Sequence, residues 1–191
     1  MTRPPPLPPT TDAHDHGRCI APADLTAFVC LLFGYFYYWT IHSDFPPPGA
    51  RGPGVFWPVL GAGLLLGSWA LTLVARRENR NDRPAGFYVS LVTAAALSVG
   101  GSVALVLGPH RTGLVPSSHV YAAIVWLLVI WGVVHVGIGL IMQLYCVARR
   151  AAGRMTARHD IDITNVSLYW HFVAITVAAT VAVIAGFPRV S

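Results

Sequence analysis

Five long apolar stretches, each bounded by proline, glycine or charged residues, make up most of the chain. A helix needs about 20 apolar residues to cross the hydrocarbon core of a bilayer, and every one of these stretches reaches that length. They run over 23–42, 54–75, 86–109, 119–148 and 166–187. The pattern predicts an all-α integral membrane protein, built as a bundle of five transmembrane helices.

The polar segments between the stretches are short, and none of them is long enough to hold a soluble domain. Residues 1–22 are rich in proline and lack the apolar core of a cleavable signal peptide. We therefore expect 1–22 to form a disordered tail and 23–191 to form one transmembrane domain.

The composition agrees with a membrane protein. Of the 191 residues, 54% are hydrophobic and 11% are charged, whereas soluble domains carry about 25% charged residues. The net charge of +5 comes from thirteen arginines and no lysine, and these arginines gather at the ends of the apolar stretches rather than in a basic stripe. The pattern favours phospholipid over nucleic acid as a partner.

The arginines are divided unequally between the two sides of the predicted bundle. The tail and the second and fourth links hold 2, 4 and 4 of them, while the other three polar segments hold one each. Because cytoplasmic segments are enriched in basic residues, the asymmetry predicts a cytoplasmic N-terminus.

Small residues recur at the four-residue spacing that lets helix backbones approach closely. One set is the GxxxG pair of Gly63 and Gly67. The other set repeats along the last stretch and consists of Ala174, Ala178, Ala182 and Gly186. Both sets predict close helix packing, within the chain or against a partner.

Four histidines lie in or at the ends of the predicted helices, but their depths do not match. A haem needs two axial ligands at one depth. From a rise of 1.5 Å per residue, His135 lies about 18 Å and His171 about 8 Å from the inner ends of their stretches. His42 and His119 lie at helix ends, where capping or contact with lipid headgroups is enough to explain them. The unequal histidine depths argue against a haem. The three cysteines are far apart and suggest no thiolate metal site, so we expect neither haem nor metal in this chain.

Carriers and pumps usually place acids at mid-membrane depth. The predicted spans contain no Glu, and their one Asp, Asp24, lies at the inner end of the first span. Paired broken helices and similar halves are absent from the pattern as well. These features argue against a stand-alone transporter.

The last third of the chain resembles the last two helices of subunit III of the haem-copper respiratory oxidases. The matching features are His135 followed by valine and glycine, Arg149 at the helix end, a polar connector with a histidine, and the tetrapeptide "YWHF" over 169–172. The segments "WTIHSDFPPPG" and "WALTLVARRENRND" are similar to earlier parts of that family. Five spans correspond to its short bacterial members.

The resemblance implies a non-catalytic subunit of an oxidoreductase complex in the bacterial inner membrane. That complex would receive its electrons from cytochrome c or quinol. It implies no cofactor in this chain, haem and copper in partner subunits, and contacts with catalytic subunit I, with subunit II and with phospholipid. Arg149, Trp170 and His171 form the expected lipid-binding set. Arg149 would hold a lipid phosphate, and Trp170 would anchor at the inner membrane–water interface. His171 would form a hydrogen bond with a neighbouring helix. His135, Tyr169, Trp170, His171 and Phe172 would be the structural motif.

The chain also departs from that family. A buried glutamate usual in its members falls here at Val29, and of two paired histidines only His135 remains, the other position being Gly132. Two alternatives stay open: an accessory subunit of a nitric oxide reductase, and an independent membrane carrier of haem or protons.

Overall fold

The computed structural model describes residues 12–156 and 160–187, with the side chains of the first helix described from Asp24 onward. All regular elements in this part of the chain are α-helices. Each of them contains a segment long and apolar enough to cross a membrane, which confirms the predicted all-α class. The helices are α1 (Asp12–Ile41), α2 (Phe56–Arg80), α3 (Pro84–Arg111), α4 (Val120–Ala151) and α5 (Ile161–Gly186).

Several helices run beyond the apolar stretches that predict them. Helix α1 begins at Asp12 rather than at 23, so 12–22 are helical and not part of a tail, while 1–11 lie outside the described residues. Helix α2 continues past 75 to Arg80, and α5 begins at Ile161 rather than at 166. An apolar stretch marks where a helix can meet hydrocarbon, whereas the backbone hydrogen bonds continue into polar sequence.

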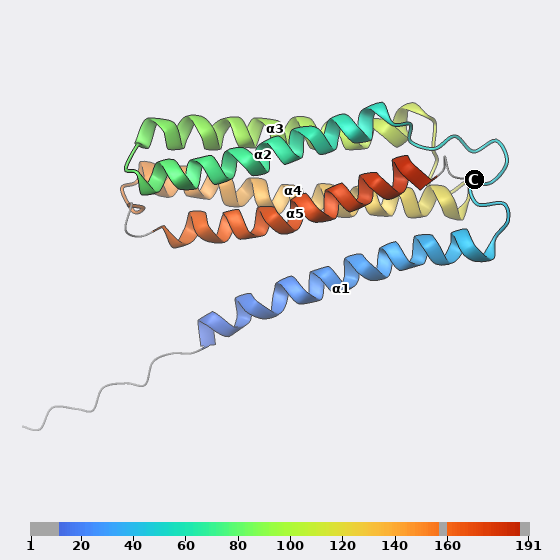
Figure 1. Cartoon of the computed structure of the whole chain (residues 1–191), viewed down its shortest axis with the longest axis horizontal. Helices are drawn as coiled ribbons and strands as arrows, with labels where there is room; N and C mark the ends of the chain where they lie inside the picture. The colour runs from blue at the N-terminus through green and yellow to red at the C-terminus, as the bar shows by residue number, and fades with distance from the viewer. Residues whose placement is uncertain (1–11, 157–159, 188–191) are drawn as a thin grey trace, which may run out of the picture.

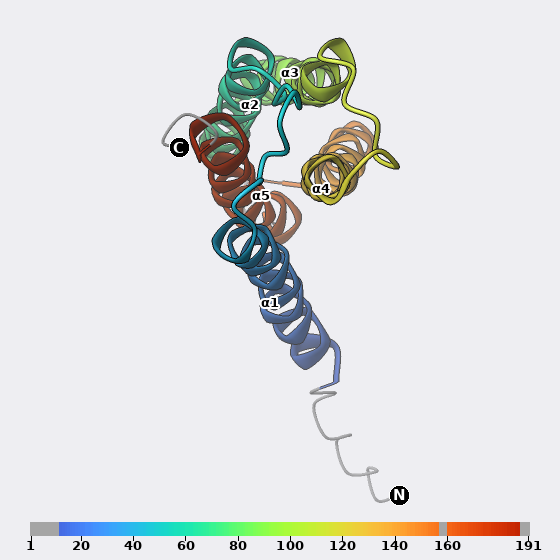
Figure 2. The ribbon, with the colours of Figure 1, turned by 90° about the vertical axis from the view of Figure 1, so that its right-hand side faces the viewer.

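Helices α2 to α5 pack around a common core, and α1 lies outside them (Figures 1 and 2). Helix α3 contacts α2 and α4, and α5 contacts the same two helices, which closes the ring. Helix α1 packs mainly on α4 and diverges from the bundle toward its N-terminus (Figure 1). Only 11% of its apolar segment is buried, against 39–50% for the other four helices, so α1 is largely uncovered within the chain.

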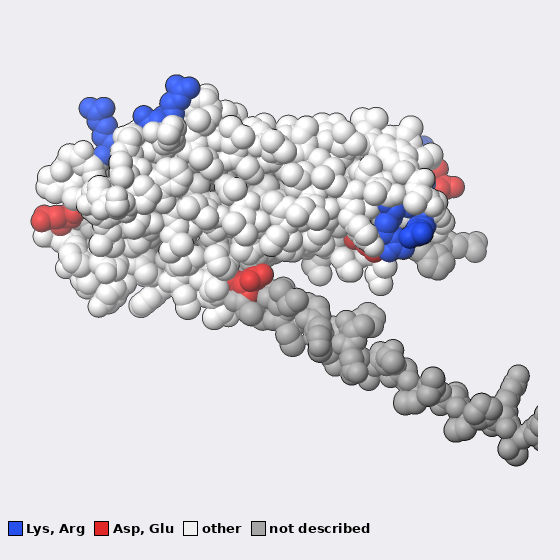
Figure 3. Space-filling view, turned by 180° about the vertical axis from the view of Figure 1, so that it is seen from behind, with Lys and Arg blue, Asp and Glu red and all other residues white. Residues whose placement is uncertain are grey.

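Charged side chains gather at the two ends of the bundle (Figure 3). We call the end with the α2–α3 link and the α4–α5 connector the arginine end, because it carries Arg76, Arg77, Arg80, Arg83, Arg149, Arg150 and Arg154. The opposite end, formed by residues 42–55 and 112–119, is called the proline end. Its described arginines are Arg51 and Arg111.

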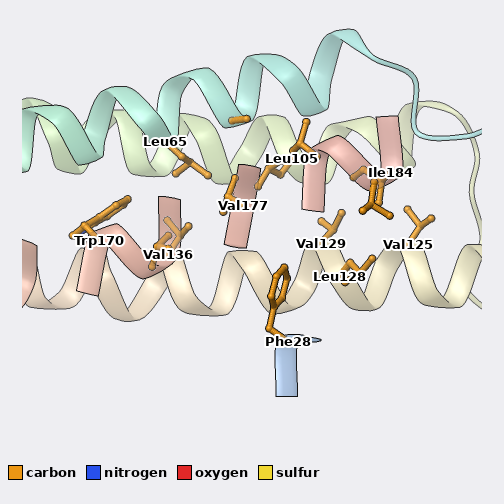
Figure 4. Close-up of a cluster of buried hydrophobic side chains, with 14 of the residues drawn as sticks. Phe28, Leu65, Leu105, Val125, Leu128, Val129, Val136, Trp170, Val177 and Ile184 are labelled. Atoms are coloured by element: carbon orange, nitrogen blue, oxygen red, sulfur yellow. The ribbon is translucent and has the colours of Figure 1, made fainter. Parts of the chain in front are cut away.

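The core between the four helices consists of leucine, isoleucine and valine side chains, together with Trp170 (Figure 4). Phe28 projects from α1 toward α4 and is 3% exposed. Helices α2 and α3 approach most closely at Gly61 and Gly101. A Cβ added to Gly101 would lie 2.6 Å from Leu65 Cγ, so only glycine fits there without a shift.

The predicted small-residue contacts are only partly realised. The α2–α3 crossing uses Gly61 rather than Gly63, since Gly63 has no neighbour within 4 Å of an added Cβ. On α5, Ala174 is buried, whereas Ala178, Ala182 and Gly186 are exposed. The reason is rotational: an exact four-residue repeat drifts around a helix of 3.6 residues per turn, so its members leave one contact face.

Candidate functional site

The residues that carry the sequence resemblance come together where α4 and α5 pack side by side. The Tyr169 hydroxyl donates to the backbone carbonyl of His135 at 3.1 Å. The Phe172 ring lies against the His135 imidazole, with 5.7 Å between ring centroids. Trp170 packs on Gly139, where an added Cβ would lie 3.1 Å from the indole. Five residues from two distant segments therefore take part in the packing of α4 on α5.

Trp170 does not lie at an interface. Its side chain is 0% exposed, and it is the largest fully buried side chain in the described core. Gly139 leaves the space on α4 that the indole fills. The expectation of interfacial anchoring is therefore corrected: in this chain Trp170 packs between helices, away from any lipid surface.

The predicted difference in depth between His135 and His171 is wrong. Phe172 contacts His135, so the residue beside it, His171, lies near the same level along the bundle. The estimate failed because it treated the ends of the two apolar stretches as level. The two imidazoles nevertheless have different surroundings, since His171 meets Trp69 on α2 with 5.4 Å between centroids.

His171 is exposed and forms its hydrogen bond within its own helix. Its Nδ1 lies 2.6 Å from the carbonyl oxygen of Ser167, four residues earlier, and a carbonyl can only accept. The expected hydrogen-bond partner on a neighbouring helix is therefore wrong. What α2 supplies instead is the Trp69 ring, which lies nearly perpendicular to the imidazole.

His135 is the motif residue with an ionisable partner. Its Nε2 lies 3.7 Å from Oδ2 of Asp24 on α1, and its Nδ1 lies 2.8 Å from the carbonyl oxygen of Trp131. The side chain of His135 is 7% exposed and that of Asp24 is 36% exposed. Asp24 shares a face of α1 with Phe28, one turn away, which is buried against the bundle. The structure thus brings a carboxylate beside an imidazole about halfway along α4.

Arg149 pairs with an acid at the arginine end. Its Nη1 lies 3.0 Å from Oδ2 of Asp162, and its Nη2 donates to the carbonyl of Arg154 at 3.4 Å. The guanidinium also lies over the Tyr145 ring. An Arg–Asp pair is one of the arrangements open to a helix-end arginine, the others being extension into water and contact with a phosphate.

Arg150 ties α4 to the α2–α3 link. It donates to the Asn79 side-chain oxygen and to Asp82 at 3.2 Å, and it lies over the Phe87 ring. Its side chain is 8% exposed. With Asn79 fully buried, this group fastens the arginine end from within.

Arg80 and Asp160 form a second link across that end. Arg80 Nε donates to Asp160 Oδ2 at 2.7 Å. This hydrogen bond is the main reason that the pKa of the Asp160 carboxyl lies below its ordinary value of 3.8. The pair joins the end of α2 to the start of α5.

A buried polar network, missed by the sequence reasoning, joins α2, α3 and α4. The Gln143 side-chain amide donates to Thr72 at 2.9 Å and to Ser68 at 3.3 Å. The Ser68 and Ser98 hydroxyls lie 2.8 Å apart, and all four side chains are 0% exposed. A glutamine inside an apolar stretch and a Ser–Thr pair at four-residue spacing were the available signals.

A pocket of about 120 Å³ lies at the proline end, lined by residues of 38–47 and 119–121 that include His42, Asp44 and His119. His119 caps α4, since its Nδ1 accepts from the backbone N–H of Ala122 at 3.0 Å, which is one of the two roles expected for it, the other being contact with lipid headgroups. His42 stacks on Tyr38. Among the described residues, no group of three His, Cys, Asp or Glu side chains has metal-binding geometry.

Comparison with protein-family models gives no match, and comparison with curated proteins gives none either.

Proposed function

We propose that this chain is the non-catalytic third subunit of a bacterial haem-copper terminal oxidase, inserted in the inner membrane with its N-terminus in the cytoplasm. The observation that carries the proposal is the α4–α5 contact. Of the residues through which the sequence resembles that family, Tyr169 and Phe172 contact His135, and Trp170 packs on Gly139, one turn further along α4. Motif residues that pack on each other support a role in building the fold.

The distribution of charge supports insertion and orientation. The arginine end carries most of the described arginines, and the proline end carries two. Between the ends, the bundle surface is mainly apolar, with exposed residues such as Phe33, Val89 and Ile141 on different helices. An exposed apolar belt between two charged ends suits a bilayer, and the arginine end would face the cytoplasm.

The weakly covered helix α1 supports assembly with other subunits. Its exposed large side chains are apolar and occur along the whole described part of the helix: Leu25, Val29, Phe33, Tyr37 and Ile41. In a complex this surface would contact the catalytic subunit I, subunit II or phospholipid held between subunits. Haem and copper would reside in those partners, which reduce dioxygen with electrons from cytochrome c or quinol.

Purification of the native complex tests this function directly. With an affinity tag on the C-terminus of the full chain, we expect a haem-copper subunit I to co-purify and to be identified by mass spectrometry. The chain expressed alone should show no Soret band. A stoichiometric haem in the isolated chain, or native membranes in which no haem-copper subunit co-purifies, would overturn the proposal. Nitric oxide reductase subunits in the purified complex would favour the accessory role in that enzyme.

Lipid binding at the arginine end is the finer part of the proposal. Arg149 is 33% exposed and keeps N–H donors beyond those used on Asp162 and Arg154. A phosphate could share the guanidinium with Asp162, because charge-assisted contacts to arginine are often bidentate. Arg149→Ala should then release tightly bound phospholipid from the purified complex, as measured by native mass spectrometry.

Asp162→Asn serves as the matched control for that experiment. It removes the carboxylate from Arg149 while leaving the guanidinium free for phosphate, so bound lipid should persist or increase. If both substitutions leave the lipid content unchanged, the arginine acts only through its ion pair, and the lipid-binding part of the proposal is wrong.

A further inference from the structure

Asp24 and His135 lie far from both charged ends of the bundle. His135 is the sixteenth residue of the 32-residue helix α4, which puts it about 24 Å of helix rise from Ala151. If α4 crosses a bilayer, this pair lies near the middle of the hydrocarbon. Ionisable residues at that depth are costly to bury and generally functional.

The hydrogen bond at one ring nitrogen determines which nitrogen of His135 can exchange a proton. Nδ1 faces the Trp131 carbonyl at 2.8 Å, and because a carbonyl only accepts, Nδ1 carries a hydrogen. The exchangeable position is therefore Nε2, the atom that faces Asp24 at 3.7 Å. This distance is longer than a direct hydrogen bond but within the range of an ion pair.

The surroundings of the pair contain few other ionisable groups. On α5 the nearest is Tyr169, which interacts electrostatically with Asp24 and whose hydroxyl is bonded to the His135 carbonyl. The rings of Trp131 and Phe172 cover the imidazole. The next ion pair along α4 in the described chain, Arg149 with Asp162, is about 21 Å away by helix rise. Among the side chains that the structure describes, the imidazole is the one basic group within ion-pair distance of the carboxylate.

We propose that Asp24 and His135 form an intramembrane proton-binding site that takes up one proton as a pair. With Asp24 ionised and His135 neutral, the pair carries one uncompensated negative charge. Transfer of a proton from hydronium to Nε2 releases water and leaves an imidazolium beside the carboxylate, with no net charge. Asp24, 36% exposed, is the point of entry, and His135, 7% exposed, holds the proton.

This inference goes beyond the proposed function, because it needs only that the helices cross a membrane. Coupling is its distinctive consequence: groups that share a proton titrate as a unit, so altering one changes the titration of the other. A carboxylate that merely faces lipid headgroups would titrate without regard to His135.

Infrared difference spectroscopy on the full chain in lipid nanodiscs tests the coupling. Between acidic and alkaline samples we expect an imidazole ring band that changes with pH and a carboxylate stretching band that shifts with it, because the proton binds beside an ionised Asp24. Asp24→Asn should remove the carboxylate band and alter the pH dependence of the imidazole band. His135→Gln should alter the pH dependence of the Asp24 band, since it removes the imidazole that holds the shared proton.

Asp44→Asn, in the loop at the proline end, is the control and should change neither band. Circular dichroism establishes that each variant is folded, and if Asp24→Asn fails to fold, His135→Gln alone still tests the coupling. An Asp24 band with the same midpoint in the parent and in His135→Gln would overturn the proposal. The proposal would also be overturned if Asp24→Asn had the same carboxyl bands as the parent protein.

Discussion

Gly101 is the position where the packing of α2 on α3 leaves least room. A Cβ at this residue would lie 2.6 Å from Leu65 Cγ, 2.9 Å from Leu65 Cδ2 and 3.1 Å from the Gly61 carbonyl oxygen. Carbon atoms pack best at about 3.5–4.0 Å, so Gly101→Ala forces a shift of nearly 1 Å. The atom that must move is the branched Cγ of Leu65, not the flexible end of a side chain, and the Gly61 backbone carbonyl is also close.

Gly100 provides a matched control on the same helix. Its added Cβ would meet only Leu64 Cδ1, at an ordinary 3.6 Å. Both substitutions share the gain in helix propensity from replacing glycine, about 1 kcal/mol in water. Their difference therefore isolates the clash, and overpacking of a core costs about 1–3 kcal/mol. We expect Gly101→Ala to be less stable than Gly100→Ala by that amount.

Reversible unfolding in mixed micelles, followed by far-ultraviolet circular dichroism, measures the difference. In a double-mutant cycle, Leu65→Ala should cost less in the Gly101→Ala background than in the parent, because it removes the clashing side chain. Residues in contact usually couple by about 0.5–3 kcal/mol. Equal stability of the two alanine variants, together with no coupling to Leu65, would refute the close α2–α3 crossing.

The same unfolding assay checks three further changes. Gln143→Leu should destabilise by about 1–2 kcal/mol, since interhelical hydrogen bonds in membrane proteins average about 0.6 kcal/mol each; a more stable variant would contradict the role of the network. Gly139→Ala, which crowds the indole to 3.1 Å, should be less stable than Gly137→Ala, which meets nothing within 4 Å. Because its pKa is lowered on folding, Asp160 stabilises the fold above pH 3.8 and loses this effect as the pH falls below it. Arg80→Gln should reduce that pH dependence, because the Arg80 guanidinium is the largest cause of the lowered pKa; the effect is at most about 1 kcal/mol for so exposed a pair.

The helices themselves could be predicted from the sequence, but their ends could not. Apolar stretches of membrane length have few alternatives to a helix, because every backbone polar group must be satisfied internally. Nothing comparable limits the polar residues that follow. Residues 12–22 and 76–80 are helical in the structure although their composition is polar, and the predicted boundaries are wrong there for that reason.

The pairing of Asp24 with His135 follows from such a boundary. Measured from the apolar stretch, Asp24 stands at the very start of a helix, where an acid is unremarkable. In the structure it is the thirteenth residue of α1, and the turn that carries it faces the middle of α4. Sequence periodicity cannot reveal this contact, because α1 is apolar on the face toward the bundle and on the face away from it.

The same ambiguity limits what the sequence predicts for the motif on α5. The position of the motif in the helix can be predicted, but the directions in which its side chains face cannot. Neighbouring residues on a helix differ by about 100° in direction, so Trp170 and His171 must face different surroundings. Trp170 is buried and His171 is exposed. A uniformly apolar helix gives no signal as to which side is which, and both residues were assigned to one lipid-facing set.

The exposed positions of α5 lie on one face of the helix. They recur at alternating intervals of three and four residues, which is the spacing of a helix seam: Leu168, His171, Ile175, Ala178 and Ala182. His171 thus lies on the same face as the small residues, turned away from the Trp170 side that packs into the core. Substitutions on the Trp170 side must act on the folding of the chain itself. His171 still contacts Trp69 on α2, so its substitution also affects packing within the chain. At the exposed positions Leu168, Ile175, Ala178 and Ala182, an effect on a complex would instead report contact with a neighbouring subunit or with lipid.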